Sequence, residues 1–175
     1  MGFIDRYIRA LGASTLENGA QPGRAEPVLA AAFAAAGKSG ELGPLLHRVK
    51  YADDPLRDAG NLRQLLQLWT AEVTRRGRAR KWVPENTAWN AQAAHKFYQL
   101  VAELSLAHWI DGSCKQCGGT GTINTSICGG CKGRGEAPIE HPGGFVRECV
   151  KDMVSELHGV AGRHAARANA RLNNK

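Results

Sequence analysis

Apolar side chains recur at the three- and four-residue spacing of an α-helix through most of the chain. One alanine-rich stretch is bounded by Pro27 at a helix start and by Gly37 just after a helix end. The sequence Asp53-Asp54-Pro55 separates two further segments, and the turn over residues 140–144 precedes the last one. The pattern predicts helices over residues 3–11, 27–36, 44–51, 57–74 and 88–110, and from Phe145 onward.

Three of these helices carry most of the larger apolar side chains and are expected to form the core. They are Leu62, Leu65, Leu66, Trp69 and Val73 on the first, Trp89, Ala93, Phe97, Leu100, Val101, Leu104 and Ala107 on the second, and Val146, Cys149, Val150, Met153, Val154 and Leu157 on the third. Cys149 is thus expected to be a buried helix residue. His47 is expected on a helix surface and not as a metal ligand. Gly77 is expected to end its helix.

The pattern Cys-x-x-Cys-x-Gly-x-Gly occurs twice between the last two helices, over residues 114–121 and 128–135. Two Cys-x-x-Cys turns can direct four thiolates at one ion, which is the tetrahedral shell that zinc prefers. The glycines allow the backbone to turn back beside each thiolate with positive φ and to direct N–H groups at sulfur. We therefore predict one Zn²⁺ bound by Cys114, Cys117, Cys128 and Cys131.

Because cysteine fills all four ligand places, no place remains for a water, and the zinc is expected to be structural rather than catalytic. A thioredoxin-like redox couple would need a surrounding βαβ pattern that this sequence lacks. A disulfide pair would need an oxidising compartment, and nothing in the sequence indicates export. His108 lies near the cysteines in sequence, but four thiolates leave no need for it as a ligand.

The predicted fold class is mainly α: a helical bundle with a four-cysteine zinc knuckle or ribbon inserted between two long helices. We expect a helical body over residues 1–112, the knuckle over 113–136, and a C-terminal helix with a basic tail over 137–175, all in one compact unit. A chain of 175 residues is long enough for such a body with a small insert. Much of its apolar content is alanine, so the helices depend on their few larger side chains for burial.

The net charge of +7 favours an anionic partner such as nucleic acid. Positive charge is concentrated in residues 75–82, expected to be a loop, and on an arginine face of the tail, which has few apolar anchors. The run over 75–82 fits either phosphate contacts or a solvated helix C-terminus. The predicted nucleic-acid contacts are Arg75, Arg76, Arg78, Arg80, Lys81, Lys132, Arg134, Arg163, Arg167 and Arg171.

Several classes of protein are not indicated by the sequence. The N-terminus is too short and too charged for a signal peptide, and no stretch approaches the ~18 apolar residues of a membrane span. Neither a phosphate-binding P-loop nor the Gly-x-Ser-x-Gly or His-Glu-x-x-His motif occurs. We therefore expect a cytoplasmic protein that is not an enzyme, with no membrane and no small-molecule substrate as partner.

The paired repeats resemble those of the DnaJ-type cysteine-rich domain. That domain carries four repeats and two zinc ions, whereas this chain has two repeats. The dipeptide His141-Pro142 is followed by Gly143 and not by the aspartate of a J domain, so co-chaperone activity is not expected.

The order of elements resembles the phage lambda-type late-gene antitermination proteins Q. These have a helical body, a long helix that leads into one Cys-x-x-Cys-x-Gly-x-Gly repeat, a second repeat and more helix. In this chain the corresponding parts are residues 88–110, 114–121, 128–135 and 145 onward. The family reads DNA with a helix-turn-helix, whereas only one long helix and a tail are visible here after Gly135.

The resemblance implies a DNA-binding regulator in the cytoplasm of a bacterial host. Such a protein engages RNA polymerase, with its sigma factor, near a late promoter and makes it read through terminators. One alternative is a zinc knuckle that binds a protein partner, chaperone-like or as an adaptor, without DNA. Another is an RNA-binding knuckle, which should have stacking aromatic residues near the metal; Trp109 is the one such residue close in sequence.

Overall fold

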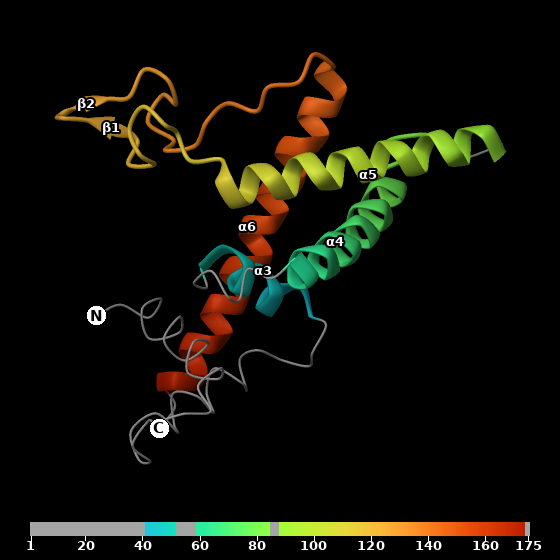
Figure 1. The fold of residues 1–175 in the computed structure, drawn as a ribbon, viewed down its shortest axis with the longest axis horizontal. Helices are drawn as coiled ribbons and strands as arrows, with labels where there is room; N and C mark the ends of the chain where they lie inside the picture. The colour runs from blue at the N-terminus through green and yellow to red at the C-terminus, as the bar shows by residue number, and fades with distance from the viewer. Residues whose placement is uncertain (1–40, 52–58, 85–87, 174–175) are drawn as a thin grey trace. The chain divides into compact units, whose positions relative to one another are not determined.

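The computed structural model describes residues 41–51, 59–84 and 88–173, so the helices predicted over 3–11 and 27–36 lie outside the described residues. The described elements are α3 (Leu42–Tyr51), α4 (Ala59–Ala79), α5 (Ala88–Asp111), β1 (Thr122–Ile123), β2 (Ser126–Ile127) and α6 (Gly144–Asn173). Figure 1 shows the cysteine segment leaving the end of α5 and leading back to the start of α6. The predicted mainly α fold class, with the cysteine segment between two long helices, is confirmed.

The chain divides into two units. One contains the described residues up to Trp69 together with those from His158 onward, and the other spans Thr70–Leu157. The division falls within α4 and within α6, so each unit contains part of both helices. The cysteine segment and residues 75–82 belong to the second unit.

The first unit buries Leu45, Leu46 and Val49 of α3 and Leu65 and Trp69 of α4. Leu65 and Trp69 were expected in the apolar stripe of their helix, and for them the pattern was right. Leu62, which was expected in the same stripe, is 43% exposed. It lies in the first turn of α4.

The prediction for His47 was wrong. Its side chain is buried, and its Nε2 lies 3.1 Å from the carbonyl oxygen of Ala161. The ring centroid lies 5.0 Å from that of His164, which is also buried. Burial lowers the pKa of His47, while the contact with the Ala161 carbonyl opposes that shift. His47 therefore fixes α3 to the C-terminal part of α6.

The C-terminal tail was expected to pack poorly, and this too was wrong. Helix α6 runs without a break to Asn173, and Ala161, His164 and Ala168 are buried along it. A Cβ on Gly43 of α3 would lie 2.9 Å from the Cβ of His164. A glycine on one helix and small or ring side chains on the other let the two backbones approach closely without large aliphatic anchors.

The second unit has a core built from α4, α5 and α6. It contains Val73, Tyr98, Val101, Cys149, Val150, Met153 and Leu157. The residues expected on α6 are confirmed as buried, except Val146, which is half-buried.

The inner face of α5 is turned by about one residue from the predicted one. The buried positions are Ala94, Tyr98, Val101, Ala102, Ser105, Leu106 and Trp109, whereas Trp89 and Leu100 are exposed. Apolar residues occur all round this helix, so their spacing alone does not select a face. Small residues such as Ala94 and Ser105 line the buried side, where another helix can approach closely; Ser105 donates its hydroxyl to the Val101 carbonyl at 2.6 Å.

Gly77 does not end α4, which continues to Ala79. A Cβ on Gly77 would lie 2.4 Å from Cε1 of Tyr98 and 2.9 Å from Cε3 of Trp82, so the glycine makes room for two aromatic rings. Lys81, two residues beyond the end of the helix, has a left-handed φ of 54°. The N–H of Trp82 donates to the Gly77 carbonyl and that of Lys81 to the Arg78 carbonyl, both at 3.0 Å, as in a Schellman cap.

The substitution Gly77→Ala distinguishes a glycine that ends a helix from one that makes room for the rings of Tyr98 and Trp82. Because Tyr98 is buried and cannot shift freely, we expect the substitution to lower the free energy of unfolding by about 1–3 kcal/mol. Gly162→Ala is the control: this helical glycine has open space around its Cβ position, and alanine should add up to about 1 kcal/mol. Urea unfolding followed by circular dichroism measures both, and a stabilised Gly77→Ala variant would contradict the packing role.

Candidate functional site

The four predicted cysteine ligands come together in one cluster. Their sulfur atoms all lie within 4.8 Å of one another. The Sγ atoms of Cys114 and Cys128 are 3.9 Å apart, and those of Cys117 and Cys131 are 3.7 Å apart. A tetrahedral ion with metal–sulfur distances of about 2.3 Å holds its sulfurs about 3.8 Å apart. The cluster can therefore hold one metal ion, and its sulfurs are too far apart for disulfides.

The two repeats fold in the same way and face each other. The N–H of Cys114 donates to the Gly135 carbonyl at 2.8 Å, and the N–H of Cys128 donates to the Gly121 carbonyl at 2.9 Å. The first cysteine of each repeat thus donates its N–H to the carbonyl of the glycine that ends the other repeat. The turn after each second cysteine repeats as well, because Thr120 N–H bonds to the Cys117 carbonyl and the matching Arg134 N–H bonds to that of Cys131.

The glycines have the two roles expected from the sequence. Positive φ occurs at Gly118, Gly119, Gly121, Gly133 and Gly135. The N–H groups of the last glycines point at sulfur: Gly121 donates to Sγ of Cys117 at 3.2 Å, and Gly135 to Sγ of Cys131 at 3.3 Å. Such N–H···S hydrogen bonds stabilise the thiolate form of a ligand.

A third role of the glycines was not expected. A Cβ on Gly121 would lie 2.5 Å from the Gly133 carbonyl oxygen, and one on Gly135 would lie 2.4 Å from that of Gly119. The two turns therefore contact each other through backbone atoms on both sides of the cluster. Gly118 is different: although its φ is positive, its Cβ would meet no neighbour within 4 Å, and the equivalent position in the second repeat is Lys132.

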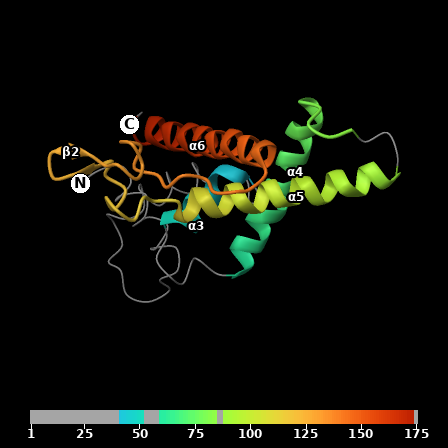
Figure 2. The ribbon, with the colours of Figure 1, turned by 90° about the horizontal axis from the view of Figure 1, so that it is seen from above.

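The six residues between the repeats, 122–127, form a short hairpin of β1 and β2. Thr122 pairs with Ile127 and Ile123 with Ser126, with Asn124 in the left-handed region at the turn. In both views the hairpin is the part of the knuckle farthest from α5 (Figures 1 and 2). Ile123 and Ile127 on the hairpin are 43% and 74% exposed.

The two ends of the knuckle pair with each other next to the end of α5. Ser113 and Glu136 form an antiparallel bridge, and the N–H of Ala137 donates to the Gly112 carbonyl at 2.8 Å. The entering and leaving strands are therefore paired immediately outside the cysteines. A metal ion held by the cluster would fix the place where the chain leaves α5 and the place from which it returns toward α6.

The environment of the thiols differs between the cluster and Cys149. Burial acts to raise the pKa of Cys117, but the N–H of Gly121 and the thiols of Cys131 and Cys114 outweigh it and lower the pKa to about 6. Burial and the nearby Asp152 carboxylate raise the pKa of Cys149 to about 11. Cys149 is buried in α6, as expected, and is a packing residue.

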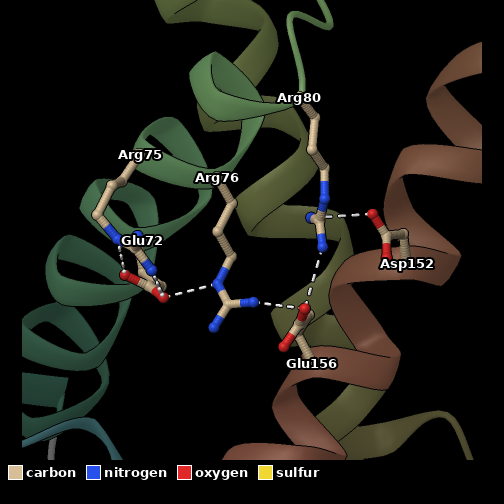
Figure 3. A network of polar contacts seen from close by, with 6 residues as sticks. All are labelled: Glu72, Arg75, Arg76, Arg80, Asp152 and Glu156. Atoms are coloured by element: carbon tan, nitrogen blue, oxygen red, sulfur yellow. Dashed lines mark hydrogen bonds and ion pairs between the residues drawn. The ribbon is translucent and has the colours of Figure 1, made fainter.

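Residues 75–82 do not form the predicted loop, because the first five of them belong to α4. Three of the arginines in this run bind carboxylates (Figure 3). Arg75 donates two hydrogen bonds to the Glu72 carboxylate, of 2.9 and 2.7 Å, and Arg76 donates one of 2.6 Å. These hydrogen bonds lower the pKa of Glu72 to about 2, and those from Arg75 contribute most.

The same run also connects α4 to α6. Arg76 pairs with Glu156, and Arg80 pairs with Asp152 at 2.9 Å and with Glu156 at 3.0 Å (Figure 3). A carboxylate shared between two arginines holds the helices at a fixed register. Arg75, Arg76 and Arg80 thus have structural partners, and contact between them and nucleic acid stays a prediction.

The other predicted nucleic-acid contacts are distributed over several elements. Arg78 and Lys81 are exposed and line a shallow open pocket with Val83 and Pro84. Lys132 and Arg134 are exposed on the second repeat, where Arg134 Nε also donates to the Cys131 carbonyl at 3.3 Å. The exposed residues Arg163 and Arg167 lie one helical turn apart on α6, whereas the side chain of Arg171 lies outside the described part.

Sequence reasoning missed two features of the second unit. The side chain of Gln116 fills the space beside Gly130, where a Cβ would lie 2.2 Å from Oε1 of Gln116, and no motif marks that contact. The rings of Trp82, Phe97 and Phe145 contact one another in series. Phe97 was expected in the core. The only sequence signal for the exposure of Phe145 is its place directly after the glycines at the start of α6.

Among the described helices, none combines the length and the apolar character needed to cross a membrane. The chain matches no protein family, no curated protein and no solved structure with which it was compared. The resemblance to the antitermination proteins therefore depends on the cysteine repeats and on the order of elements around them.

Gly121→Ala and Gly135→Ala should each weaken metal binding by about 10- to 100-fold. Each would force alanine into a left-handed φ and push a Cβ against the opposite turn. Gly129→Ala is the matched control, because its φ is not positive and its Cβ has open space. Competition with a chromogenic chelator measures the affinities. Equal affinity in Gly121→Ala and Gly129→Ala would show that the backbone contact between the turns is not needed.

The thiols should react in two classes. In folded protein from which a chelator has removed the metal, four thiols should react rapidly with a chromogenic disulfide, and Cys149 should react only after unfolding, because it is buried and its thiolate is disfavoured. Cys149→Ala serves as the control and should remove only the slow thiol. Rapid reaction of all five thiols in the folded protein would contradict the assignment.

Proposed function

We propose that the chain is a zinc-containing, DNA-binding transcription antitermination factor that engages RNA polymerase near a phage late promoter. The observation that carries the proposal is the cluster of four cysteines built from two facing repeats between two long helices. This order of elements is the one in which the sequence resembles the lambda-type antitermination proteins. The proposed place of action is the cytoplasm of a bacterial host.

Zinc is the ion we propose for the cluster. Four thiolates at tetrahedral distances, with two N–H···S hydrogen bonds, suit Zn²⁺, and a site with four protein ligands is closed to water. The zinc would therefore act on the structure and not on a substrate. It would fix the knuckle and, through the paired strands at residues 113 and 136, the chain on either side of it.

The proposed DNA contacts are basic side chains that point to solvent. On the knuckle these are Lys115, Lys132 and Arg134, and on α6 they are Arg163 and Arg167. Lys132 has a left-handed backbone, which places it at the outer bend of the second turn. Contacts of this kind provide affinity for the phosphate backbone and an orientation, and they do not read sequence.

A second candidate function is a zinc knuckle that binds a protein without DNA. The observation that favours it is the hairpin: residues 116–131 carry no charged side chain, and Ile123 and Ile127 are exposed there. In this function the exposed isoleucines of the hairpin would contact an apolar surface of the partner. If this function were the true one, substitution of both isoleucines by serine would abolish binding of the protein partner.

The antitermination proposal predicts a discrete footprint on promoter DNA from the gene's own neighbourhood, with and without RNA polymerase. Cys128→Ser should abolish it, because three thiolates cannot close the cluster. Lys132→Asn with Arg134→Gln should lower the slope of log affinity against log salt by up to about 1.8, which is about 0.9 for each phosphate that is no longer neutralised. Asparagine tolerates the left-handed backbone of Lys132, so the knuckle should stay folded.

The matched control removes the same charge elsewhere: Arg63→Gln with Lys96→Gln changes two exposed helix residues outside the proposed surface. Its salt slope should stay near that of the unaltered protein. If both pairs change the slope equally, the knuckle makes no special contact and only the overall charge matters. If no site is protected at any salt concentration, DNA binding is wrong and the protein-binding function takes its place.

A further inference from the structure

Three aromatic rings of the second unit form a continuous series. The rings of Trp82 and Phe97 meet edge to face with centroids 6.4 Å apart, and those of Phe97 and Phe145 are stacked at 5.6 Å with only 14° between their planes. We call Trp82, Phe97 and Phe145 the aromatic ladder. The residues come from three segments: the end of α4, the middle of α5 and the start of α6.

The ladder is not sealed inside the core. Phe145 is 55% exposed, and Trp82 and Phe97 are half-buried. One face of Phe145 is covered by the stacked Phe97, so its exposure comes largely from the rest of the ring. The stacked contact with Phe97 supports the ring of Phe145 from one side and leaves part of it open to a ligand.

Positive charge lies at the other end of the ladder. The guanidinium carbon of Arg80 lies 5.6 Å from the centroid of Trp82. Arg78 and Lys81 flank the same corner of the chain, where they line the open pocket with Val83 and Pro84. The carboxylates nearest to Arg80, Asp152 and Glu156, are bound by Arg76 and Arg80 themselves. Glu148, three residues beyond Phe145, is paired with Lys151 at 2.8 Å.

This combination has a known chemical match. Unpaired bases stack on exposed aromatic rings, and the phosphates of the same strand are attracted to cations along its path. Duplex DNA cannot use such a surface, because its bases are already stacked on one another. An apolar protein segment could cover Phe145, but it would gain nothing from Arg78 and Lys81.

The geometry points to the aromatic ladder as a binding site for an unpaired nucleic-acid strand, with a base stacked on Phe145 and phosphates near Arg78 and Lys81. The site is separate from the knuckle and does not depend on the proposed duplex contacts. It also differs from the RNA-binding knuckle considered from the sequence, because Trp109, the aromatic residue nearest the cysteines in sequence, is buried and offers no stacking face.

The test is fluorescence anisotropy of the metal-loaded full chain with labelled oligothymidylate or oligouridylate of about 12 nucleotides, and with a duplex of the same length. Phe145→Ala should weaken binding of the single strands by between about 5-fold and about 150-fold and leave duplex binding unchanged. Phe145→Tyr keeps the ring and should restore binding. Phe145→Leu keeps apolar bulk without a ring and should fail to restore it.

Two further variants locate the site. Lys81→Asn, which suits the left-handed backbone, should lower the single-strand salt slope by about 0.7. Trp89→Ala removes another exposed ring of α5, one that has no ring contact with the ladder among the described residues, and it should have no effect. The ratio of affinities for the thymidylate and the uridylate shows whether the strand is DNA or RNA.

Three results would overturn the proposal. They are the absence of single-strand binding by the unaltered protein, full binding by Phe145→Leu, and an equal loss in Trp89→Ala. Full binding by Phe145→Leu would mean that the strand does not stack a base on this ring. Because duplex binding is measured in the same variants, failure of the ladder and failure of the proposed duplex contacts are distinguishable.

Discussion

The four sulfur atoms are the constraint on which the knuckle depends. Seven of the 22 residues from 114 to 135 are glycine, and the buried cluster of this segment consists of cysteines alone. A segment that leaves its two isoleucines exposed cannot offset the conformational entropy of its glycines by burial. The four sulfur atoms lie within 4.8 Å of one another. As thiolates they would repel one another, and a bound cation would offset that repulsion. With an ion bound, the hydrogen bonds between the two turns would join backbone atoms that the ligands have already placed.

The helices around the knuckle are held by a different means. In the second unit, α4 and α6 are joined by aliphatic and aromatic burial and by arginines that share Glu156. In the first unit, close approach takes the place of large side chains: Gly43 lies against His164, and His47 contacts the Ala161 carbonyl. The cations that seemed free in the sequence are therefore partly committed to structure. Exposed basic residues lie on the knuckle, on α6 and at the corner beside Trp82.

The sequence predicted the cluster, its ligands and the glycine conformations, because these follow from local chemistry: thiolate geometry and positive φ depend on neighbours along the chain. The errors have one physical origin, which is that they concern contacts between distant segments. Gly77 looked like a helix end because a glycine usually is one, but it is required by the ring of Tyr98. His47 looked solvent-exposed because its partner lies 114 residues away. Arg76 and Arg80 looked like phosphate ligands because nothing nearby in sequence reveals Glu156. The aromatic ladder was missed for the same reason, since its rings come from three elements.

The most direct test of the account is metal stoichiometry combined with cobalt substitution of the purified chain. The account predicts one zinc per chain as isolated. It also predicts that Co²⁺ in its place gives the intense thiolate charge-transfer and tetrahedral ligand-field bands of a four-sulfur site, with loss of folded signal from the knuckle when the metal is removed. A chain that binds no metal, or whose cobalt spectrum shows six-coordinate geometry, while the knuckle keeps its folded signal, would contradict it. The knuckle would then have to be held by its backbone contacts alone.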